Sequence, residues 1–202
     1  MQIPDPALVV LVGAAGSGKS TWAAAHYRPT EVVSSDALRA AVGSGTADLD
    51  ASDEAFQILD QVVAGRCRRG LTVVVDTLGL DADRRAGWAA LARKAGLPVV
   101  AVVFDTPAAT CRARNAARDR PVPASVLGLQ LHRMRDIQRE LEAEGWDVHV
   151  VDSETSVAAA PTAPVATGPV ATRPIAARPV AVARGRHTGQ CPWRHREPTV
   201  HG

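Results

Sequence analysis

The segment GAAGSGKS, residues 13–20, constrains the fold of this chain more than any other feature. It fits the pattern G-x-x-x-x-G-K-[ST], with Gly13, Gly18, Lys19 and Ser20 at the fixed positions. The run ALVVLV before it is wholly apolar, as buried parallel strands are, and TWAAAHY after it suits a helix. A strand, a glycine-rich turn and a helix in this order form a loop that binds phosphate groups.

Each residue type in this loop has a chemical reason. Glycine lets successive backbone N–H groups turn toward phosphate oxygens, and the start of the following helix adds favourable partial charge. Lys19 is expected to reach the β- and γ-phosphates, and the Ser20 hydroxyl is expected to ligate Mg²⁺. We therefore predict that ATP and Mg²⁺ bind here, with contacts from Gly13, Ala14, Ala15, Gly16, Ser17, Gly18, Lys19, Ser20 and Thr21.

Four further apolar runs alternate with helical patterns along the chain. The expected strands are residues 7–12, 31–34, 71–75, 99–104 and 146–151, and the clearest helical patterns are 53–69, 81–95 and 123–144. This alternation predicts an α/β fold of the P-loop NTPase type, with a parallel sheet covered by helices on both faces. Ligands of such sheets bind at the carboxyl ends of the strands, where the phosphate loop, Asp36 and Asp76 should meet.

Two of the helical patterns make specific predictions about packing. In 81–95, Asp81 is placed to cap the helix, and the face that carries Trp88, Leu91 and Ala95 is expected to be buried. In 123–144, a single long helix is expected, with an apolar stripe formed by Leu127, Leu131, Met134 and Leu141.

The composition changes after Asp152, where prolines begin to recur every five residues in PVATG, PVATR, PIAAR and PVAVA. Such a stretch has no face to bury and predicts a disordered linker. We therefore divide the chain into a P-loop domain at 1–152, a linker rich in Pro, Ala, Val and Thr at 153–186, and a short basic tail at 187–202, through which a protein partner could bind. The tail spacing His-x₃-Cys-x₃-His could hold Zn²⁺ through His187, Cys191 and His195, but a solvated basic tail is the favoured interpretation.

Charge and cysteine content narrow the classes of function. Up to Asp152 there are 17 basic and 19 acidic side chains, so the expected domain is not a broadly basic nucleic-acid binder. The three cysteines are widely spaced and imply no disulfide framework. The N-terminus lacks the layout of a signal peptide and no apolar run has the length of a membrane span, so we expect a cytoplasmic protein with no membrane contact.

Two carboxylates follow expected strands. Asp36, in EVVSSDALR, is a candidate general base for an attacking hydroxyl group, and Arg39 lies one helical turn later, where it could hold an anionic acceptor. The alternative is that Asp36 only caps the helix that follows, which is a favoured position for aspartate. Asp76, at the end of LTVVV, is a candidate Mg²⁺ ligand, with a cap of the turn at Asp76 and Thr77 as the alternative.

Arginines cluster in CRARNAARDRPVP, at the end of an expected helix and in the loop before Pro121. A loop of this kind above a triphosphate can neutralise charge in the transition state and exclude water. The alternative is a solvated basic helix face. The members are Arg112, Arg114, Arg118 and Arg120.

The motifs GAAGSGKST, SSDALR, VVVDT, AVVFD and ARN…DRPVP, in this order, resemble the 5′-hydroxyl polynucleotide kinase module of bacterial polynucleotide kinase-phosphatases and the wider group of small, AAA-type P-loop kinases. The resemblance covers roughly residues 7–150. It implies an adenylate-kinase-like fold and transfer of the ATP γ-phosphate to a 5′-hydroxyl end of RNA or DNA. In this resemblance, Asp36 matches the general base, Arg39 the acceptor-binding arginine and Arg120 a lid arginine; Arg112 or Arg114 matches another, and we place Arg114 among the nucleotide contacts.

The resemblance is incomplete, because the family often has Asp-Ala-Thr-Asn where this chain has Asp76-Thr77-Leu78-Gly79, and phosphatase and ligase modules are absent. Three functions therefore stay open: a polynucleotide 5′-hydroxyl kinase, a kinase for a small hydroxyl compound such as a nucleoside, sugar or antibiotic, and a nucleotide-binding module that regulates a partner without transfer.

Overall fold

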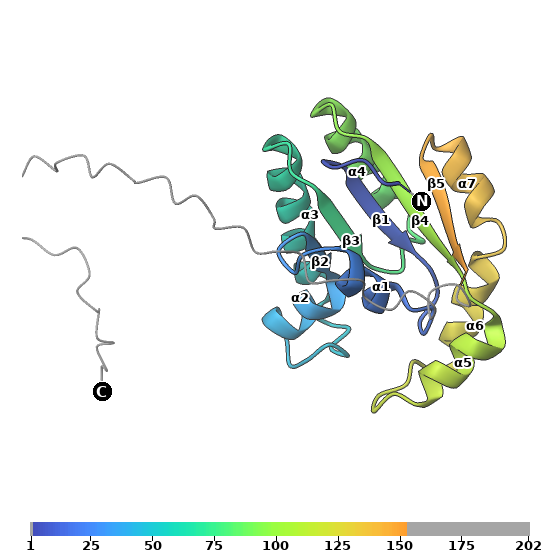
Figure 1. The fold of residues 1–202 in the computed structure, drawn as a ribbon. Helices are drawn as coiled ribbons and strands as arrows, with labels where there is room; N and C mark the ends of the chain where they lie inside the picture. The colour runs from blue at the N-terminus through green and yellow to red at the C-terminus, as the bar shows by residue number, and fades with distance from the viewer. Residues whose placement is uncertain (1, 153–202) are drawn as a thin grey trace, which may run out of the picture. The chain divides into compact units, whose positions relative to one another are not determined.

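The computed structural model describes residues 2–152, so the expected linker and tail lie outside the described residues. Five parallel strands form one sheet in the order β2-β3-β1-β4-β5 (Figure 1). The strands are β1 (Leu8–Val12), β2 (Val32–Ser34), β3 (Val73–Asp76), β4 (Val99–Asp105) and β5 (Asp147–Asp152). The predicted α/β fold with a parallel sheet is confirmed.

Seven helices connect these strands within residues 2–152. They are α1 (Lys19–His26), α2 (Ser35–Val42), α3 (Ser52–Arg68), α4 (Ala82–Lys94), α5 (Ala108–Ala116), α6 (Ala124–Arg133) and α7 (Ile137–Ala143). None of the helices in this part of the chain is long and apolar enough to cross a membrane.

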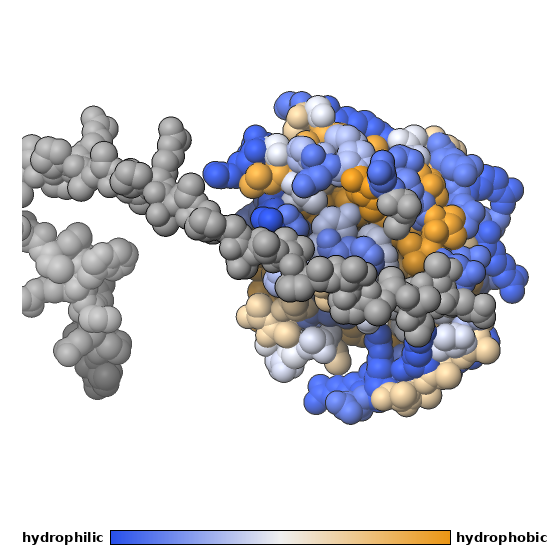
Figure 2. Space-filling model, in the orientation of Figure 1, coloured by the Kyte–Doolittle hydropathy of each residue, from blue (hydrophilic) through white to orange (hydrophobic). Residues whose placement is uncertain are grey.

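The central strand β1 shows why the sheet needs helices on both sides. All five of its residues are fully buried. Successive side chains of a strand point to opposite faces: Leu8, Val10 and Val12 pack in a core cluster with α3, α4 and α7, whereas Val9 and Leu11 pack in a second cluster with α1. In the view of Figure 2, hydrophobic residues gather over the central strands and hydrophilic residues surround them.

Strand register brings the candidate site residues to one rim. Leu11, near the end of β1, pairs with Asp76 on β3, and Asp76 pairs in turn with Ser34 on β2. Because the strands are parallel and end at the same level, the phosphate loop after β1, the helix after β2 and the loop after β3 begin beside one another.

The expected helix at 123–144 is wrong in one respect, because a turn at residues 134–136 divides it into α6 and α7. The two halves serve different cores. Leu127 of α6 packs against the phosphate loop, whereas Ile137 and Leu141 of α7 pack in the main cluster under the sheet. A single straight helix could not face both clusters.

The buried face of α4 is also different from the predicted one. Asp81 caps the helix as expected, because its side chain accepts a hydrogen bond from the Arg84 N–H at 3.0 Å. The buried residues are Arg85, Trp88, Ala89 and Ala92, and Leu91 and Ala95 are exposed. The prediction is therefore right for Trp88 and wrong for Leu91 and Ala95, because the buried face of α4 is turned toward Arg85, a charged residue that the apolar pattern does not include.

Candidate active site

The phosphate loop is held between two other segments by close backbone contacts. Gly16 and Gly18 have positive φ angles, 82° and 99°, which favour glycine. A Cβ atom on Gly16 would lie 2.6 Å from the carbonyl oxygen of Cys111 on α5. On the other side, the Gly13 N–H donates to the Leu78 carbonyl at 3.1 Å. The turn is therefore shaped by α5 and by the loop after β3.

Lys19, the first residue of α1, is buried against this loop. Its ammonium donates to the carbonyl oxygens of Gly13 at 2.8 Å and Ala14 at 3.0 Å. Burial lowers the pKa of Lys19 to about 8, and the carboxylates of Asp76 and Asp36 oppose that shift. The structure therefore brings Lys19, Asp76 and Asp36 close enough for their charges to interact.

Asp76 ends β3 with its carboxylate buried beside the start of α1. Burial raises its pKa, while a hydrogen bond with the Ser20 side chain and the charge of Lys19 lower it. The turn that follows is closed by Thr77, whose Oγ1 accepts from the Gly79 N–H at 3.0 Å, so the cap of this turn is not Asp76. A carboxylate beside a serine hydroxyl is a set of hard oxygen donors that fits Mg²⁺ when substrate phosphates complete the shell.

The cap of α2 is Ser34, whose side chain accepts from the Ala37 N–H. The interpretation of Asp36 as the cap is therefore wrong: Asp36 lies in the first turn, with 60% of its side chain exposed. Its partner is the guanidinium of Arg39, which also donates through Nε to the Thr46 carbonyl at 3.1 Å. The Arg39 side chain is only 15% exposed, so it is an engaged group that holds Asp36 and the loop after α2.

The arginine cluster lies on both sides of the end of α5. Arg114 approaches the phosphate loop, with Nη1 3.5 Å from the Gly16 carbonyl oxygen. Arg118 lies in the loop between α5 and α6, and its charge contributes to the lowered pKa of Lys19. All four arginines are exposed. The structure therefore places Arg114 beside the phosphate loop and Arg118 close enough to act on the charge of Lys19, and Arg120 lies further along the same loop.

Three polar residues with contacts at this site were not predicted from the sequence. Arg85 is fully buried and donates to the Gly79 carbonyl at 2.8 Å, which secures the loop that binds Gly13. Gln130 accepts from the Ala15 N–H at 2.9 Å, and Asn115 bonds to the backbone of Val122. Asn115 belongs to the motif ARN…DRPVP but received no role there. No sequence pattern marks Arg85 or Gln130, because their partners are backbone groups or are distant in the chain.

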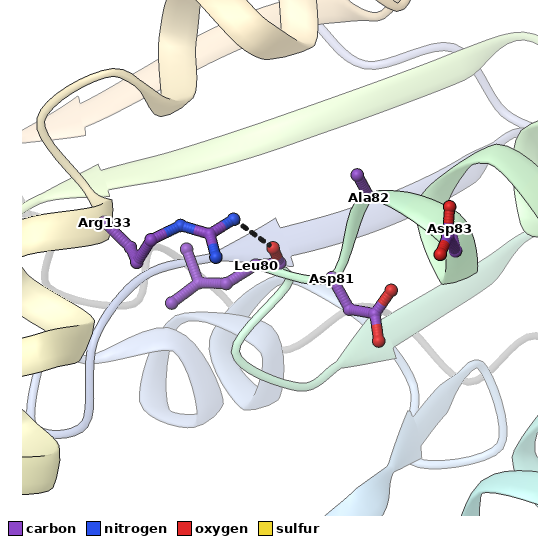
Figure 3. Close-up of a pocket in the computed structure, with 5 residues that line it drawn as sticks. All are labelled: Leu80, Asp81, Ala82, Asp83 and Arg133. Carbon is purple, nitrogen blue, oxygen red and sulfur yellow. Dashed lines mark hydrogen bonds between the residues drawn. The ribbon is translucent and has the colours of Figure 1, made fainter.

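A hollow of about 410 Å³ lies between the start of α4 and the end of α6 (Figure 3). It is lined by Leu80, Asp81, Ala82, Asp83 and Arg133. Two of its charged groups already have structural partners: Asp81 caps α4, and Arg133 donates to the Leu80 carbonyl at 3.1 Å. The hollow is therefore part of the packing between α4 and α6, and we assign it no ligand.

These features define a class of protein. The GxxxxGKS loop lies at the carboxyl rim of a parallel sheet with strand order 2-3-1-4-5, and it brings Lys19 and Ser20 beside the strand-end Asp76. This arrangement is the nucleotide site of a P-loop domain of the kinase-like type. The chain belongs to the AAA domain family AAA_33, whose model matches residues 8–141. No curated protein matches the chain.

Several solved structures share the fold. The Pnkp1/Rnl/Hen1 RNA repair complex contains a chain that is 19% identical over 69% of this chain and 47% of its own length, with a TM-score of 0.54. The PezAT toxin–antitoxin system of Streptococcus pneumoniae matches with 15% identity, over 75% of this chain and 69% of that one, and a TM-score of 0.57. A complex of AvrRxo1-ORF1 and -ORF2 with ATP matches with 15% identity, over 73% and 55%, and a TM-score of 0.54. At such identities the likeness shows a common fold.

Proposed function

We propose that this protein is an ATP-dependent kinase that transfers the γ-phosphate to the 5′-hydroxyl end of RNA or DNA. The observation that carries the proposal is the state of Asp36. Its carboxylate has no capping role, lies at the rim beside the phosphate loop, and is close enough to Lys19 and Asp76 to shift the pKa of each. A module that only binds nucleotide needs no general base in that place.

The phosphate loop, the candidate Mg²⁺ ligands and the arginines have separate roles in the proposed phosphoryl transfer. The loop at 13–21 binds the triphosphate, and Lys19 turns its ammonium from the loop carbonyls to the β- and γ-phosphates. Ser20 and Asp76 would hold Mg²⁺, which neutralises phosphate charge when it is bound. Arg114 lies near Gly16, and Arg118 and Arg120 occupy the adjoining loop, where a guanidinium can offset the charge of the transition state.

Asp36 is the base in this scheme. Its carboxylate takes the proton of the acceptor hydroxyl as that oxygen bonds to the γ-phosphorus, and the bond from phosphorus to the leaving oxygen of ADP breaks. Arg39 keeps the carboxylate oriented through their ion pair. The same guanidinium, beside the proposed base, is the group we propose for the phosphate 3′ to the reacting nucleotide.

A polynucleotide acceptor is supported by the order of the motifs from GAAGSGKST to DRPVP, which resembles that of polynucleotide kinases. It is also supported by the fold that this chain shares with a chain of an RNA repair complex. A small hydroxyl compound is the second candidate, because Arg39 already bonds to Asp36 and Thr46 and has little exposed surface. An uncharged acceptor would require no further cation at this place.

The decisive measurement is transfer from radiolabelled ATP to 5′-hydroxyl RNA and DNA oligonucleotides, beside a panel of nucleosides, sugars and antibiotics. Asp36→Asn should lower transfer by ~10²–10⁴-fold, the usual contribution of a general base, with ATP affinity unchanged. Asp53→Asn, the same change at an exposed first-turn aspartate of α3, is the control and should be silent.

Arg39→Ala separates the two acceptor classes. It should reduce kcat/KM for an oligonucleotide far more than for a nucleoside that lacks the 3′ phosphate. A faster reaction of the wild-type protein with a small neutral alcohol than with any oligonucleotide would replace the polynucleotide proposal by the second candidate. Absence of transfer to every acceptor, together with tight ATP binding, would favour the non-catalytic module.

A further inference from the structure

We propose that Gln130 is a positioning residue that latches α6 to the phosphate loop and thereby sets the position of the lid loop, residues 117–123, with its arginines Arg118 and Arg120. The proposal rests on phosphoryl transfer from ATP, not on the identity of the acceptor. It assigns to Gln130 no contact with substrate.

The latch is a hydrogen bond between elements far apart in the chain. The backbone N–H of Ala15, inside the phosphate loop, donates to Gln130 Oε1 at 2.9 Å. The donor is a backbone amide, so the side-chain atom that faces it must be the amide oxygen of Gln130. Around this bond, Ala14, Ala15 and Leu127 form a small buried cluster. The apolar contacts of this cluster, which also include the partly buried Leu131 and Met134, are non-directional. The hydrogen bond is directional, and it is therefore the contact that determines how α6 is oriented on the loop.

The base of the lid loop is closed by a second side-chain amide. Asn115, at the end of α5, is 6% exposed and bonds to both backbone groups of Val122: its Nδ2 donates to the carbonyl at 2.8 Å, and its Oδ1 accepts from the N–H at 3.0 Å. Val122 also packs against the cluster of Ala14, Ala15 and Leu127. The two ends of the lid loop are thus tied together, and the tied base rests on the phosphate loop.

The two amides have separable tasks. Asn115 determines the shape of the lid loop, whereas Gln130 determines where α6, and with it the loop base, lies relative to the phosphates. The charge of Arg118 already acts on Lys19 in this arrangement. Because a displacement of about 1 Å of a charged group can cost on the order of 10²-fold in rate, loss of the latch should reach turnover through the lid arginines.

The test uses the full chain and two matched substitutions. Gln130→Met keeps the length of the side chain and removes the amide, and Gln138→Met makes the same change at an exposed position of α7. We expect Gln130→Met to lower kcat by about 10- to 100-fold, with a KM for ATP within about threefold, because the loop contacts of ground-state ATP remain. Gln138→Met should match the wild type.

A double-mutant cycle with Arg118→Ala and Arg120→Ala distinguishes positioning from general support. If Gln130 acts through these arginines, Gln130→Met should have little further effect once both are removed, since residues that act as a unit are not additive. An undiminished effect of Gln130→Met in that background would overturn the proposal. Gln130→Glu keeps an acceptor for the Ala15 N–H, and so its effect should fall on the KM for ATP, through charge repulsion, and less on kcat.

Two measurements distinguish a failure of this proposal from a failure of the proposed acceptor. The double-mutant cycle is also measured on ATP hydrolysis without acceptor, a reaction that can be followed even if oligonucleotides are unreactive. Hydrogen exchange of the Ala15 amide needs no activity at all: it should be about tenfold faster in Gln130→Met and near wild type in Gln130→Glu. Equal exchange in the wild type and in Gln130→Met would show that no latch exists.

Discussion

Arg85 is the largest fully buried side chain in the described part of the chain, and its removal should destabilise the domain strongly. Its guanidinium donates to the two carboxylate oxygens of Glu144 at 3.0 and 2.5 Å and to the Gly79 carbonyl at 2.8 Å. Removing one partner of a buried pair leaves the other charge without compensation, at about 3–5 kcal/mol. Glu144 is 24% exposed and keeps the indole N–H of Trp146 as a donor. Because water and this donor compensate part of its charge, we expect the loss in free energy of unfolding to lie at the lower end of that range.

We therefore expect Arg85→Met to lower the free energy of unfolding by about 3 kcal/mol, which corresponds to a fall in Tm of roughly 6–12 °C for a domain of this size. Urea denaturation followed by circular dichroism measures the change, with an unaltered m-value as the sign that the native state is otherwise intact. Arg139→Met is the matched control, since it removes an exposed ion pair with Asp136, and such pairs contribute about 0–1 kcal/mol.

The pH dependence provides an independent check on the same pair. Hydrogen bonds from Arg85 hold the pKa of Glu144 below its usual value of 4.5. A carboxyl group with a depressed pKa in the folded state contributes stability that is present above the unfolded pKa and is lost as pH falls through the folded pKa. The wild type should therefore lose more stability than Arg85→Met below pH 4.5. A variant within about 0.5 kcal/mol of the wild type at pH 7 would refute the reasoning, since that is the range of an ordinary surface substitution.

Three further predictions follow from the site and its borders. Gly16→Ala should abolish ATP binding in calorimetric titrations, because its Cβ would meet the Cys111 carbonyl at 2.6 Å with φ at +82°; Gly87→Ala, in open space on α4, is the control and should bind ATP normally. The value of kcat/KM for ATP should fall as pH rises through about 8, where Lys19 of the free protein loses its proton; a flat profile to pH 9.5 would contradict this. Deletion of residues 153–202 should leave turnover and Tm nearly unchanged, because the proline-rich repeats after Asp152 have no apolar face to bury; a large fall in Tm would show that the deleted residues contribute to the domain.

The parts of the fold that could be predicted are those encoded by local pattern. The phosphate loop, the five strands and the helix ends at Gly70 and Gly96 rest on residue types with a backbone reason, and both glycines have the positive φ angle that ends a helix, 64° and 71°. The break between α6 and α7 was not predictable in the same way. Leu127, Leu131, Met134 and Leu141 make a continuous stripe in sequence, and only the position of two separate clusters shows that the stripe must bend.

Polar side chains account for most of what the sequence did not predict. Hydropathy patterns assign Arg85 to solvent, yet its partner Glu144 is 59 residues away and makes burial favourable. The structural contacts of Asn115 and Gln130 are also not predicted by hydropathy, because side-chain amides have no periodic signature and here they bond to the backbone. In the arginine cluster, the resemblance named Arg120 and either Arg112 or Arg114. The structure places Arg114 beside the Gly16 carbonyl and Arg118 close enough to act on the charge of Lys19, and the role of Arg120 stays a prediction.

The case of Asp36 shows which kind of information decides between a structural and a chemical role. In Ser34-Ser35-Asp36 all three residues are good helix caps, so local preference favours none of them strongly. The choice is made by where β2 stops. Ser34 pairs with Asp76 as the last residue of β2, and the helix must therefore begin at Ser35, with Ser34 as its cap. Strand register, a tertiary property, thus excludes Asp36 from the capping role and leaves its carboxylate, paired with Arg39, at the rim where Lys19 and Asp76 lie.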